Sequence, residues 1–330
     1  MPFFRQPNIW DTAKAAVTPE HVFLNRRQFI RGSIAGGMGL ALLSLTGCQK
    51  ASSSAPDLGN DPLAGTQPLR FGATDLNLPD PGRTTTPRDL TARYNNFYEF
   101  GGNKNIWRAA QSLPTENWQV RVHGLIDNPK TYDIDDFTRL FGLEERLYRF
   151  RCVEAWAMTV PWVGFPMRKL LEASDPQSSA KFVKFTSFYD ERITTGPGWR
   201  PGSLPWPYQE GLRIEEMANE LAFFATGAYG HSLPKQNGAP IRMVVPWKYG
   251  FKGAKSIVDI EFTAEQPATY WNTLGPTEYK FEANVEPQVP HPRWSQAEER
   301  VIDSGNPSSW NVEPTLLYNG YGEFVADLYA

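Results

Sequence analysis

Two adjacent arginines near the start of the chain restrict what it can be more than any other feature. Residues 25–30 (Asn-Arg-Arg-Gln-Phe-Ile) form a twin-arginine export motif, and an apolar, glycine-rich stretch at 32–47 follows. That stretch is too short and too rich in glycine for a membrane-spanning helix, so residues 1–50 are predicted to be a signal peptide. Twin-arginine export carries folded proteins, usually because a cofactor was inserted first. We therefore expect a periplasmic protein folded around a cofactor.

The end of the predicted signal peptide leaves two alternatives. Residues 45–48 (Leu-Thr-Gly-Cys) fit a lipobox, in which Cys48 becomes an acylated first residue and a lipid anchor. Cleavage within 51–55 would instead give a soluble protein, which is slightly favoured. Residues 51–87 are rich in Ser, Pro, Gly and Asp without a sustained period, which predicts a linker and an irregular N-terminal wrap. Residues 88–330 are expected to form a single catalytic domain.

Composition supports a globular enzyme. Of the 330 residues, 41% are hydrophobic and 21% charged, so a large core can form. The formal net charge is -3, and no basic run is dense enough to follow a phosphate backbone, which argues against a nucleic-acid partner. Numerous aromatic residues and 28 prolines favour a mixed α+β enzyme over a helical bundle.

Apolar and polar residues alternate in stretches that are therefore predicted as strands. These stretches are residues 118–123, 147–152 and 241–245, and a further strand is predicted over 257–262. His123 is expected on a solvent-facing side of the first. A helix is predicted to begin at 165–167, since proline suits a first helical turn, and an amphipathic helix is predicted over 214–224.

The folded domain is expected to hold one thiol, because Cys152 is the only cysteine besides Cys48. Without a disulfide partner, Cys152 is either a small buried hydrophobe or a reactive group. The alternation in its strand puts Arg149 and Arg151 on one face and Cys152 with aromatic residues on the other, where the strand ends in a loop. A soft thiolate in that place suits a transition metal, so Cys152 is predicted to be a metal ligand.

Several common catalytic motifs are missing from the sequence. It has no Cys-x-x-Cys, no Cys-x-x-Cys-His, no His-Glu-x-x-His, no Gly-x-Gly-x-x-Gly after a predicted strand and no Gly-x-Ser-x-Gly. Zinc hydrolases, haem proteins, Rossmann dehydrogenases and serine hydrolases are therefore disfavoured. A metal site with one cysteine needs a cofactor that brings its own remaining ligands.

A basic loop, residues 248–255, separates the last two predicted strands and holds three lysines and two glycines. Glycine lets backbone N–H groups approach a phosphate and lysine supplies charge, so the loop is either a phosphate-binding loop or a solvated basic hairpin. Aromatic residues in and beside it favour a packed loop that faces a ligand. Lys248 and Lys252 are expected to be solvated surface charges.

Three parts of the chain together resemble a known family. They are residues 94–100 (YNNFYEF), 149–156 (RFRCVEAW) with 160–166 (VPWVGFP), and 236–257 (from QNGAPIR to VPWKYGFKGAKSI). They resemble the sulfite-oxidase-fold molybdoenzymes and, among them, the MsrP (YedY) family of periplasmic protein-methionine-sulfoxide reductase catalytic subunits. The resemblance implies an α+β fold with mixed β-sheets and surrounding helices, and one Mo-molybdopterin cofactor per chain.

The resemblance also implies the residues of the site. Cys152 would be the protein ligand of molybdenum beside the two dithiolene sulfurs of molybdopterin. The other implied cofactor-binding residues are Asn95, Tyr98, Glu99, Ser187, Asn237, Arg242 and, at the phosphate, Gly253, Ala254 and Lys255. Ser187 stands where threonine is expected but keeps the hydroxyl. Glu154 is a candidate for proton delivery or for ordering water, with a structural carboxylate as the alternative.

The activity implied is reduction of methionine sulfoxide in oxidised periplasmic proteins by oxygen-atom transfer. The chain has no haem or flavin motif, so electrons would come from a membrane haem-binding subunit (MsrQ-like) in a heterodimeric complex. One alternative is a sulfite-oxidase-like or other S-/N-oxide molybdoenzyme, for which sulfite would require an arginine-lined anion pocket. The other is an exported binding protein with an inert cysteine and no metal.

Overall fold

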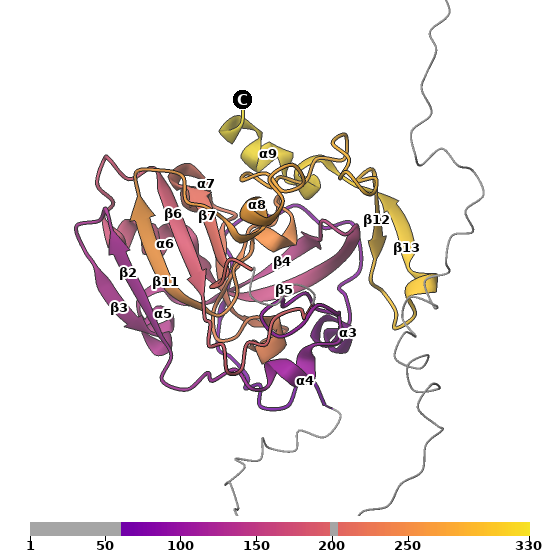
Figure 1. Cartoon of the computed structure of the whole chain (residues 1–330), viewed down its shortest axis with the longest axis horizontal. Coiled ribbons are helices and arrows are strands. Elements are labelled where there is room, and N and C mark those ends of the chain that lie inside the picture. The colour runs from indigo at the N-terminus through magenta and orange to yellow at the C-terminus, as the bar shows by residue number, and fades with distance from the viewer. Residues whose placement is uncertain (1–60, 199–203) are drawn as a thin grey trace, which may run out of the picture. The chain divides into compact units, whose positions relative to one another are not determined.

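Two mixed β-sheets with short helices around them make up the part of the chain that the structure, a computed structural model, describes (Figure 1). The described residues are 61–198 and 204–330, and they belong to one compact unit, Ser54–Ala330. The predicted signal peptide and both alternatives at Cys48 lie outside them. None of the described helices is long and apolar enough to span a bilayer.

The larger sheet has eight strands. Its main path runs β1-β4-β5-β12-β13, and β8 joins it on β5 and pairs in turn with β9 and β10. The strands are β1 (Gly72–Ala73), β4 (Glu144–Arg151), β5 (Trp156–Pro166), β8 (Phe223–Ala228), β9 (His231–Ser232), β10 (Arg242–Val244), β12 (Glu298–Val301) and β13 (Asn311–Pro314). β4 and β5 form an antiparallel hairpin whose register ends at Arg151↔Ala157, which places Cys152 in the connecting turn.

The smaller sheet has five strands in the order β3-β2-β11-β6-β7 and stands on the left in Figure 1. The strands are β2 (Gln119–Gly124), β3 (Lys130–Asp133), β6 (Phe182–Ser187), β7 (Gln209–Arg213) and β11 (Ile257–Thr263). Phe185 of β6 packs on Phe224 of β8, whose ring also meets Phe165 of β5, with centroids 6.0 and 5.4 Å apart. These aromatic contacts join the two sheets in one core.

Short helices lie around the two sheets. The α-helices are α3 (Arg88–Arg93), α4 (Trp107–Ala110), α5 (Ile134–Phe141), α6 (Met167–Ser174), α7 (Ile214–Ala218), α8 (Tyr270–Leu274) and α9 (Gly322–Val325). The 3-10 helices are η1 (Lys235–Asn237), η2 (Gly250–Lys252), η3 (Pro307–Ser309), η4 (Leu317–Gly320) and η5 (Ala326–Leu328). α6 begins directly after Pro166, as predicted, because proline fixes the backbone at a helix start without losing a needed N–H.

The four predicted strands are present, but the helix predicted over 214–224 is wrong in its second half. α7 ends at Ala218, and residues 223–228 form β8 between β5 and β10. The segment has no polar face there, because Leu221 to Ala225 are fully buried. β8 also approaches β5 closely, since a Cβ on Gly164 would lie 1.9 Å from the Phe224 carbonyl oxygen. Tertiary burial therefore overrides the helical pattern.

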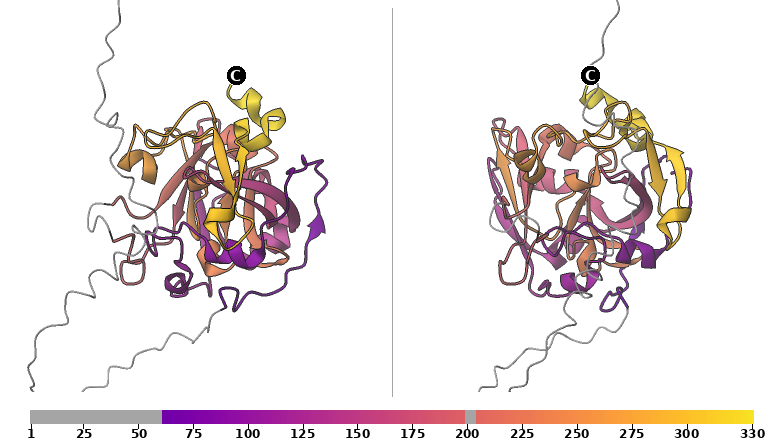
Figure 2. Two further views of the ribbon diagram at one scale, coloured as in Figure 1. Left: turned by 90° about the vertical axis from the view of Figure 1, so that its right-hand side faces the viewer. Right: turned by 45° about the vertical axis from the view of Figure 1, so that its right-hand side comes forward.

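Residues 61–87 are largely irregular and run along one side of the domain (Figure 2). β1 pairs in parallel with β4, and Pro68 forms an isolated bridge with His231. The Arg83 side chain is 4% exposed and pairs with the fully buried Glu299 of β12. This segment therefore contributes to the buried interior of the domain.

Candidate active site

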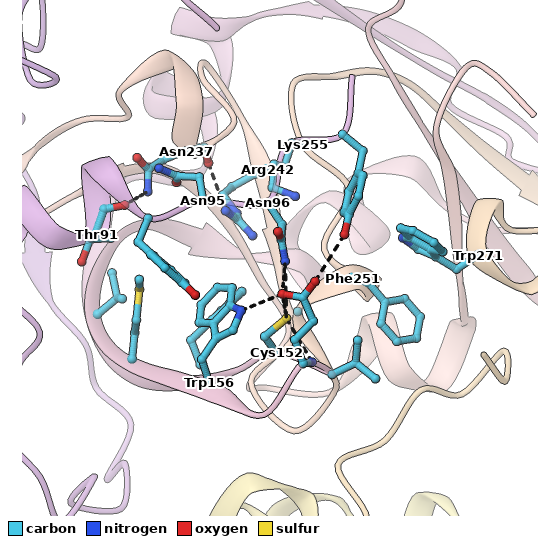
Figure 3. Close-up of a pocket in the computed structure, with 18 of the residues that line it drawn as sticks. Thr91, Asn95, Asn96, Cys152, Trp156, Asn237, Arg242, Phe251, Lys255 and Trp271 are labelled. Carbon is cyan, nitrogen blue, oxygen red and sulfur yellow. Dashed lines mark hydrogen bonds between the residues drawn. The ribbon is translucent and has the colours of Figure 1, made fainter. Parts of the chain in front are cut away.

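A cavity of about 530 Å³ opens beside the turn between β4 and β5. Figure 3 shows Asn95 and Asn237 on one side of it, Phe251 and Trp271 on the other, and Cys152 between them. The predicted site residues that line it are Asn95, Tyr98, Glu99, Cys152, Glu154, Asn237, Arg242 and Lys255. Residues from well-separated parts of the sequence thus meet in one place. The predicted Ser187, Gly253 and Ala254 are buried but do not line the cavity.

The turn that carries the thiol is tightly held. Cys152 N–H donates to the Trp156 carbonyl oxygen at 2.9 Å, and Ala155 N–H donates to the Cys152 carbonyl oxygen at 3.0 Å. Ala155 has φ +66°, a left-handed conformation that costs a residue with a side chain about 1–2 kcal/mol. As predicted, Cys152 follows the last residue of a strand, and its thiol lines the cavity.

Cys152 lies in surroundings that disfavour a free thiolate. Burial, and then the Glu154 charge, raise the pKa of the Cys152 thiol to about 12, although Lys104 and Arg151 lower it in part. Two groups donate hydrogen bonds to Sγ, Glu154 N–H at 3.4 Å and Asn96 Nδ2 at 3.5 Å. The thiol would therefore stay protonated at neutral pH unless a cation in the cavity replaced the proton, as a metal does.

Glu154 is surrounded by hydrogen-bond donors. Its carboxylate pairs with Lys104 and accepts from Trp156 Nε1 at 3.0 Å, Asn96 Nδ2 at 3.1 Å and Tyr98 OH at 3.4 Å. Burial raises the pKa of Glu154, but Lys104 and the other donors outweigh it and the net shift is downward. The carboxyl group is thus held ionised and fixed, which favours an organising role over proton delivery. Lys104 gave no sequence signal, being fifty residues away from Glu154.

Three of the predicted cofactor-binding residues carry buried polar atoms that have no protein partner within residues 61–198 and 204–330. They are Ser187 Oγ, Asn237 Oδ1 and Arg242 Nη2. The other nitrogens of Arg242 donate to Asn237 and Met243 carbonyl oxygens at 3.0 and 3.3 Å. A buried polar atom without a partner costs about 1–3 kcal/mol, so these atoms fit a ligand that would satisfy them.

Two cations, Arg242 and Lys255, face the same part of the cavity. Burial, and then the Arg242 charge, lower the pKa of Lys255, and burial also lowers the pKa of Arg242 to about 10. Burial raises the pKa of Glu99, which Lys255 lowers only in part. Among the described residues, no acceptor forms a hydrogen bond with Lys255 Nζ. An anion bound there would stabilise both cations, which fits a cofactor phosphate.

Gly253 and Ala254 run alongside β10. A Cβ on Gly253 would come within 2.8 Å of the Met243 carbonyl oxygen and 3.2 Å of Arg242 Nη2. The Gly253 N–H already donates to the Gly250 carbonyl oxygen, and the Ala254 carbonyl oxygen accepts from Met243 N–H at 2.9 Å. Glycine therefore leaves the unpartnered Arg242 nitrogen open, while the backbone of both residues serves the loop itself.

The expectation that Lys248 and Lys252 are solvated is wrong. Lys248 is 2% exposed and donates to Glu216 at 2.6 Å, Asn284 Oδ1 at 2.8 Å and a carbonyl oxygen at 2.6 Å. Lys252 is 1% exposed and pairs with Glu210 at 3.2 Å. Buried carboxylates on β7 and α7, which the loop sequence cannot reveal, draw these two lysines into the interior.

Aromatic side chains form a rim around the outer part of the cavity. Trp271 meets Tyr279 at 4.9 Å and Tyr98 at 5.0 Å between ring centroids. Arg293 and Trp294 complete the rim, with Arg293 paired to Glu278 at 2.8 Å. Tyr98 was among the predicted site residues, but Trp271, Tyr279, Arg293 and Trp294 were not, because nothing in their spacing links them to Cys152.

A second group of metal-ligand side chains lies on β2 and β11, where His123, Asp259 and Glu261 come together. His123 is half-buried and its Nε2 lies 3.0 Å from Asp259. The acids already have cationic partners, because Arg121 pairs with Asp259 at 2.7 Å and Lys184 pairs with Glu261. These ion pairs account for the group without a metal.

The geometry agrees with comparisons to known proteins. Residues 108–271 match the family described as "Oxidoreductase molybdopterin binding domain". The chain is therefore a molybdopterin oxidoreductase, its cofactor is Mo-molybdopterin, and the predicted α+β, sulfite-oxidase-like fold class is confirmed. The sulfane dehydrogenase SoxCD from Paracoccus pantotrophus is a similar solved structure, at 15% identity and TM-score 0.47 over 80% of this chain and 67% of that chain.

Proposed function

We propose that this oxidoreductase is the catalytic subunit of a periplasmic reductase that returns methionine sulfoxide in oxidised proteins to methionine. The reaction consumes one sulfoxide, two electrons and two protons, and yields the thioether and water. Mo-molybdopterin supplies the oxygen-atom transfer and the electron exchange when it is bound. The chain holds the cofactor, orients the substrate and controls access of water.

The residues around the cavity divide these tasks. Cys152 provides the thiolate for the metal, and Arg242 with Lys255 provides the charge for the phosphate. Asn237, which lines the cavity, offers its unpartnered Oδ1 to the rest of the cofactor, and the resemblance assigns the buried Ser187 hydroxyl, which lies outside the lining, to the same role. These assignments rest on burial and on the chemistry of the donor set. Cys152 and Lys255 keep the roles that the resemblance implies, whereas the resemblance places Arg242 at another part of the cofactor than the phosphate.

The choice of methionine sulfoxide as substrate rests on the aromatic rings and the paired charges around the outer part of the cavity. Its rings offer apolar, polarisable surface, and a thioether sulfur gains about 0.3–1.5 kcal/mol against an aromatic ring. The rim charge Arg293 is paired with Glu278, and Glu154 in the cavity is paired with Lys104. A neutral sulfoxide side chain fits this rim better than the sulfite anion, which would need an unpaired cation there.

Tyr98 is suited to act on the substrate oxygen. Burial, and then the Glu154 charge, raise the pKa of Tyr98 well above its usual value, so the hydroxyl keeps its proton at neutral pH. Tyr98 lines the cavity, and the hydrogen bond from its hydroxyl to Glu154 is long at 3.4 Å. We assign Tyr98 the role of donating its single hydroxyl hydrogen to the sulfoxide oxygen, in place of the long hydrogen bond to Glu154.

The substrate preference can be tested on the purified holoprotein. With a reduced dye as electron donor, an oxidised protein should lose its methionine sulfoxide, as mass spectrometry would show, while sulfite with an electron acceptor should not react. Sulfite oxidation without sulfoxide reduction would establish the rival enzyme. A folded wild-type protein without molybdenum would instead support a binding protein. Cys152→Ala serves as the inactive control.

Electron supply and location are part of the same proposal. The sequence holds no haem or flavin motif, so we assign the electrons to a membrane haem-binding partner subunit. The twin-arginine motif, which lies outside the described residues, supports export to the periplasm. Changing Arg26 and Arg27 to Lys should leave precursor in the cytoplasm, and normal periplasmic accumulation would refute this route.

A further inference from the structure

The peptide unit between Val153 and Glu154 joins the predicted metal thiolate to a buried hydrogen-bonding group. On one side, Glu154 N–H donates to Cys152 Sγ at 3.4 Å. On the other side, the Val153 carbonyl oxygen accepts from Trp294 Nε1 at 2.7 Å and from Gln296 Nε2 at 2.8 Å. Because a peptide unit is planar and its N–H and C=O point in opposite directions, holding the oxygen aims the N–H at the sulfur.

Trp294 and Gln296, here called the carbonyl clamp, are themselves held in place. Trp294 stacks on His291 with ring centroids 3.9 Å apart and an interplanar angle of 10°. Gln296 is 2% exposed, and its Oε1 accepts from Arg151 Nη2 at 2.8 Å. Arg151 is fully buried and pairs with Glu299 at 2.9 Å. The clamp is thus tied to both β4 and β12.

The turn that the carbonyl clamp holds cannot relax easily. Ala155 is in the left-handed region, Arg151 Nη1 donates to the Cys152 carbonyl oxygen, and Arg300 N–H donates to the Ala155 carbonyl oxygen at 2.8 Å. Groups outside the turn therefore fix the carbonyl groups of Cys152 and Ala155, which precede and follow the peptide unit between Val153 and Glu154. Several buried donors therefore bind backbone oxygens of the turn, and the Glu154 N–H is directed at the sulfur.

We propose that Trp294 and Gln296 are positioning residues that raise the reduction potential of the metal through the Glu154 N–H. A hydrogen bond to a ligating sulfur withdraws electron density from it, which favours the reduced metal. Two donors on the Val153 oxygen polarise the same peptide unit and strengthen its N–H as a donor. The inference rests on Cys152 as the thiolate ligand, a part of the proposed function, but not on the identity of the substrate.

The test is a redox titration of the holoprotein followed by the Mo(V) electron paramagnetic resonance signal. Gln296→Met removes one donor and keeps the volume, and Arg151 retains Thr315 and Glu298 as acceptors. Trp294→Phe removes the other donor and keeps a ring to stack on His291. We expect each variant to change the equilibrium between oxidation states about three- to tenfold toward the oxidised metal, which lowers the potential by about 28–59 mV for one electron.

Trp310→Phe is the matched control. Trp310 is also a buried indole that donates to a backbone oxygen, but that oxygen belongs to Ser304, at 2.8 Å, outside the turn around Cys152. Its variant should keep the wild-type potential. The inference is overturned if both clamp variants retain molybdenum at the wild-type potential, if their potential rises, or if Trp310→Phe shifts it equally.

Two further outcomes keep the test decisive. If Gln296→Met does not retain molybdenum, Trp294→Phe decides alone, because its ring still fills the stacking position. If the wild-type protein itself holds no molybdenum, the proposed function fails. If the wild type holds molybdenum and reduces sulfoxide while the potential of the clamp variants is unchanged, only the role of the carbonyl clamp is rejected.

Discussion

Three lysines of one short loop lie in two different surroundings. Lys248 and Lys252 point into the interior, where Glu216 and Glu210 pair with them. Lys255 lines the cavity and has no hydrogen-bond acceptor among the described residues. A buried charge with its own partner belongs to the scaffold, whereas a half-buried charge on the cavity wall that lacks an acceptor marks where a ligand binds.

The same contrast separates two polar regions on either side of Cys152. On one side, the fully buried Glu299 pairs with three arginines, Arg83, Arg149 and Arg151. On the cavity side, Asn237 and Arg242 line the cavity and Ser187 is buried outside its lining, and each keeps a buried polar atom that meets no protein partner among the described residues. Buried ion pairs within the protein hold the turn around Cys152, whereas polar atoms without protein partners mark the side where the cofactor would bind. Each of the following experiments tests whether that distinction holds.

The largest effect is expected from Lys248→Met. It leaves Glu216 buried with only weaker compensation, from Tyr329 OH at 2.6 Å and Arg213 at 3.7 Å. Breaking a buried ion pair from one side costs about 3–5 kcal/mol, so the free energy of unfolding of the cofactor-free protein should fall by about that much in urea titrations. Lys255→Met should lower it by no more than about 1 kcal/mol. Equal losses of unfolding free energy in the two variants would show that Lys248 and Lys255 do not differ in their contribution to the scaffold.

Lys255→Met should instead weaken cofactor binding. Losing a charge-assisted contact of about 1.5–3 kcal/mol lowers affinity about ten- to a hundredfold. The readout is molybdenum and pterin content per chain under identical expression. Lys181→Met is the control, because Lys181 is exposed and donates only to the Ser178 carbonyl oxygen. Full cofactor in Lys255→Met, or the same loss in the control, would remove Lys255 from the site.

Ser187→Ala should act in opposite directions on the two forms of the protein. Without cofactor, stability should stay level or rise, because the substitution removes a buried hydroxyl that has no partner. With cofactor, losing one hydrogen bond of about 0.5–1.5 kcal/mol should weaken binding about two- to tenfold. Ser187→Thr keeps the hydroxyl and should bind like wild type. A destabilised apoprotein with unchanged pterin content would show that Ser187 belongs to the scaffold.

The smallest effect concerns His291, which supports the rim. Burial lowers the pKa of His291 below its usual value of about 6.5, although Glu278 raises it in part. A lowered folded-state pKa stabilises the fold above about pH 6.5, and this contribution is lost as the pH falls below that value. Urea titrations of the cofactor-free protein at pH 7.5 and 5 should therefore show a smaller loss for His291→Phe than for wild type. An equal or larger loss of unfolding free energy in His291→Phe would contradict this contribution of His291.

The sequence predicted those parts of the site that depend on local pattern. Alternation placed Cys152 at a strand end, and the resemblance brought together residues that do meet around one cavity. It could not show which lysines of the loop are buried, because their carboxylate partners lie on β7 and α7. For the same reason Lys104 and Gln296 were missed, since their partners are distant in sequence and only the fold brings them together.

The most direct test of the account is the number of sulfur atoms bound to molybdenum, measured by X-ray absorption on wild type and Cys152→Ser. If Cys152 holds the metal in this cavity, the wild type should show two cofactor sulfurs and one more, and Cys152→Ser should show one sulfur fewer on a folded protein that keeps its pterin. The same sulfur count in both proteins would mean that the metal is not bound by Cys152, and the central claim would be wrong.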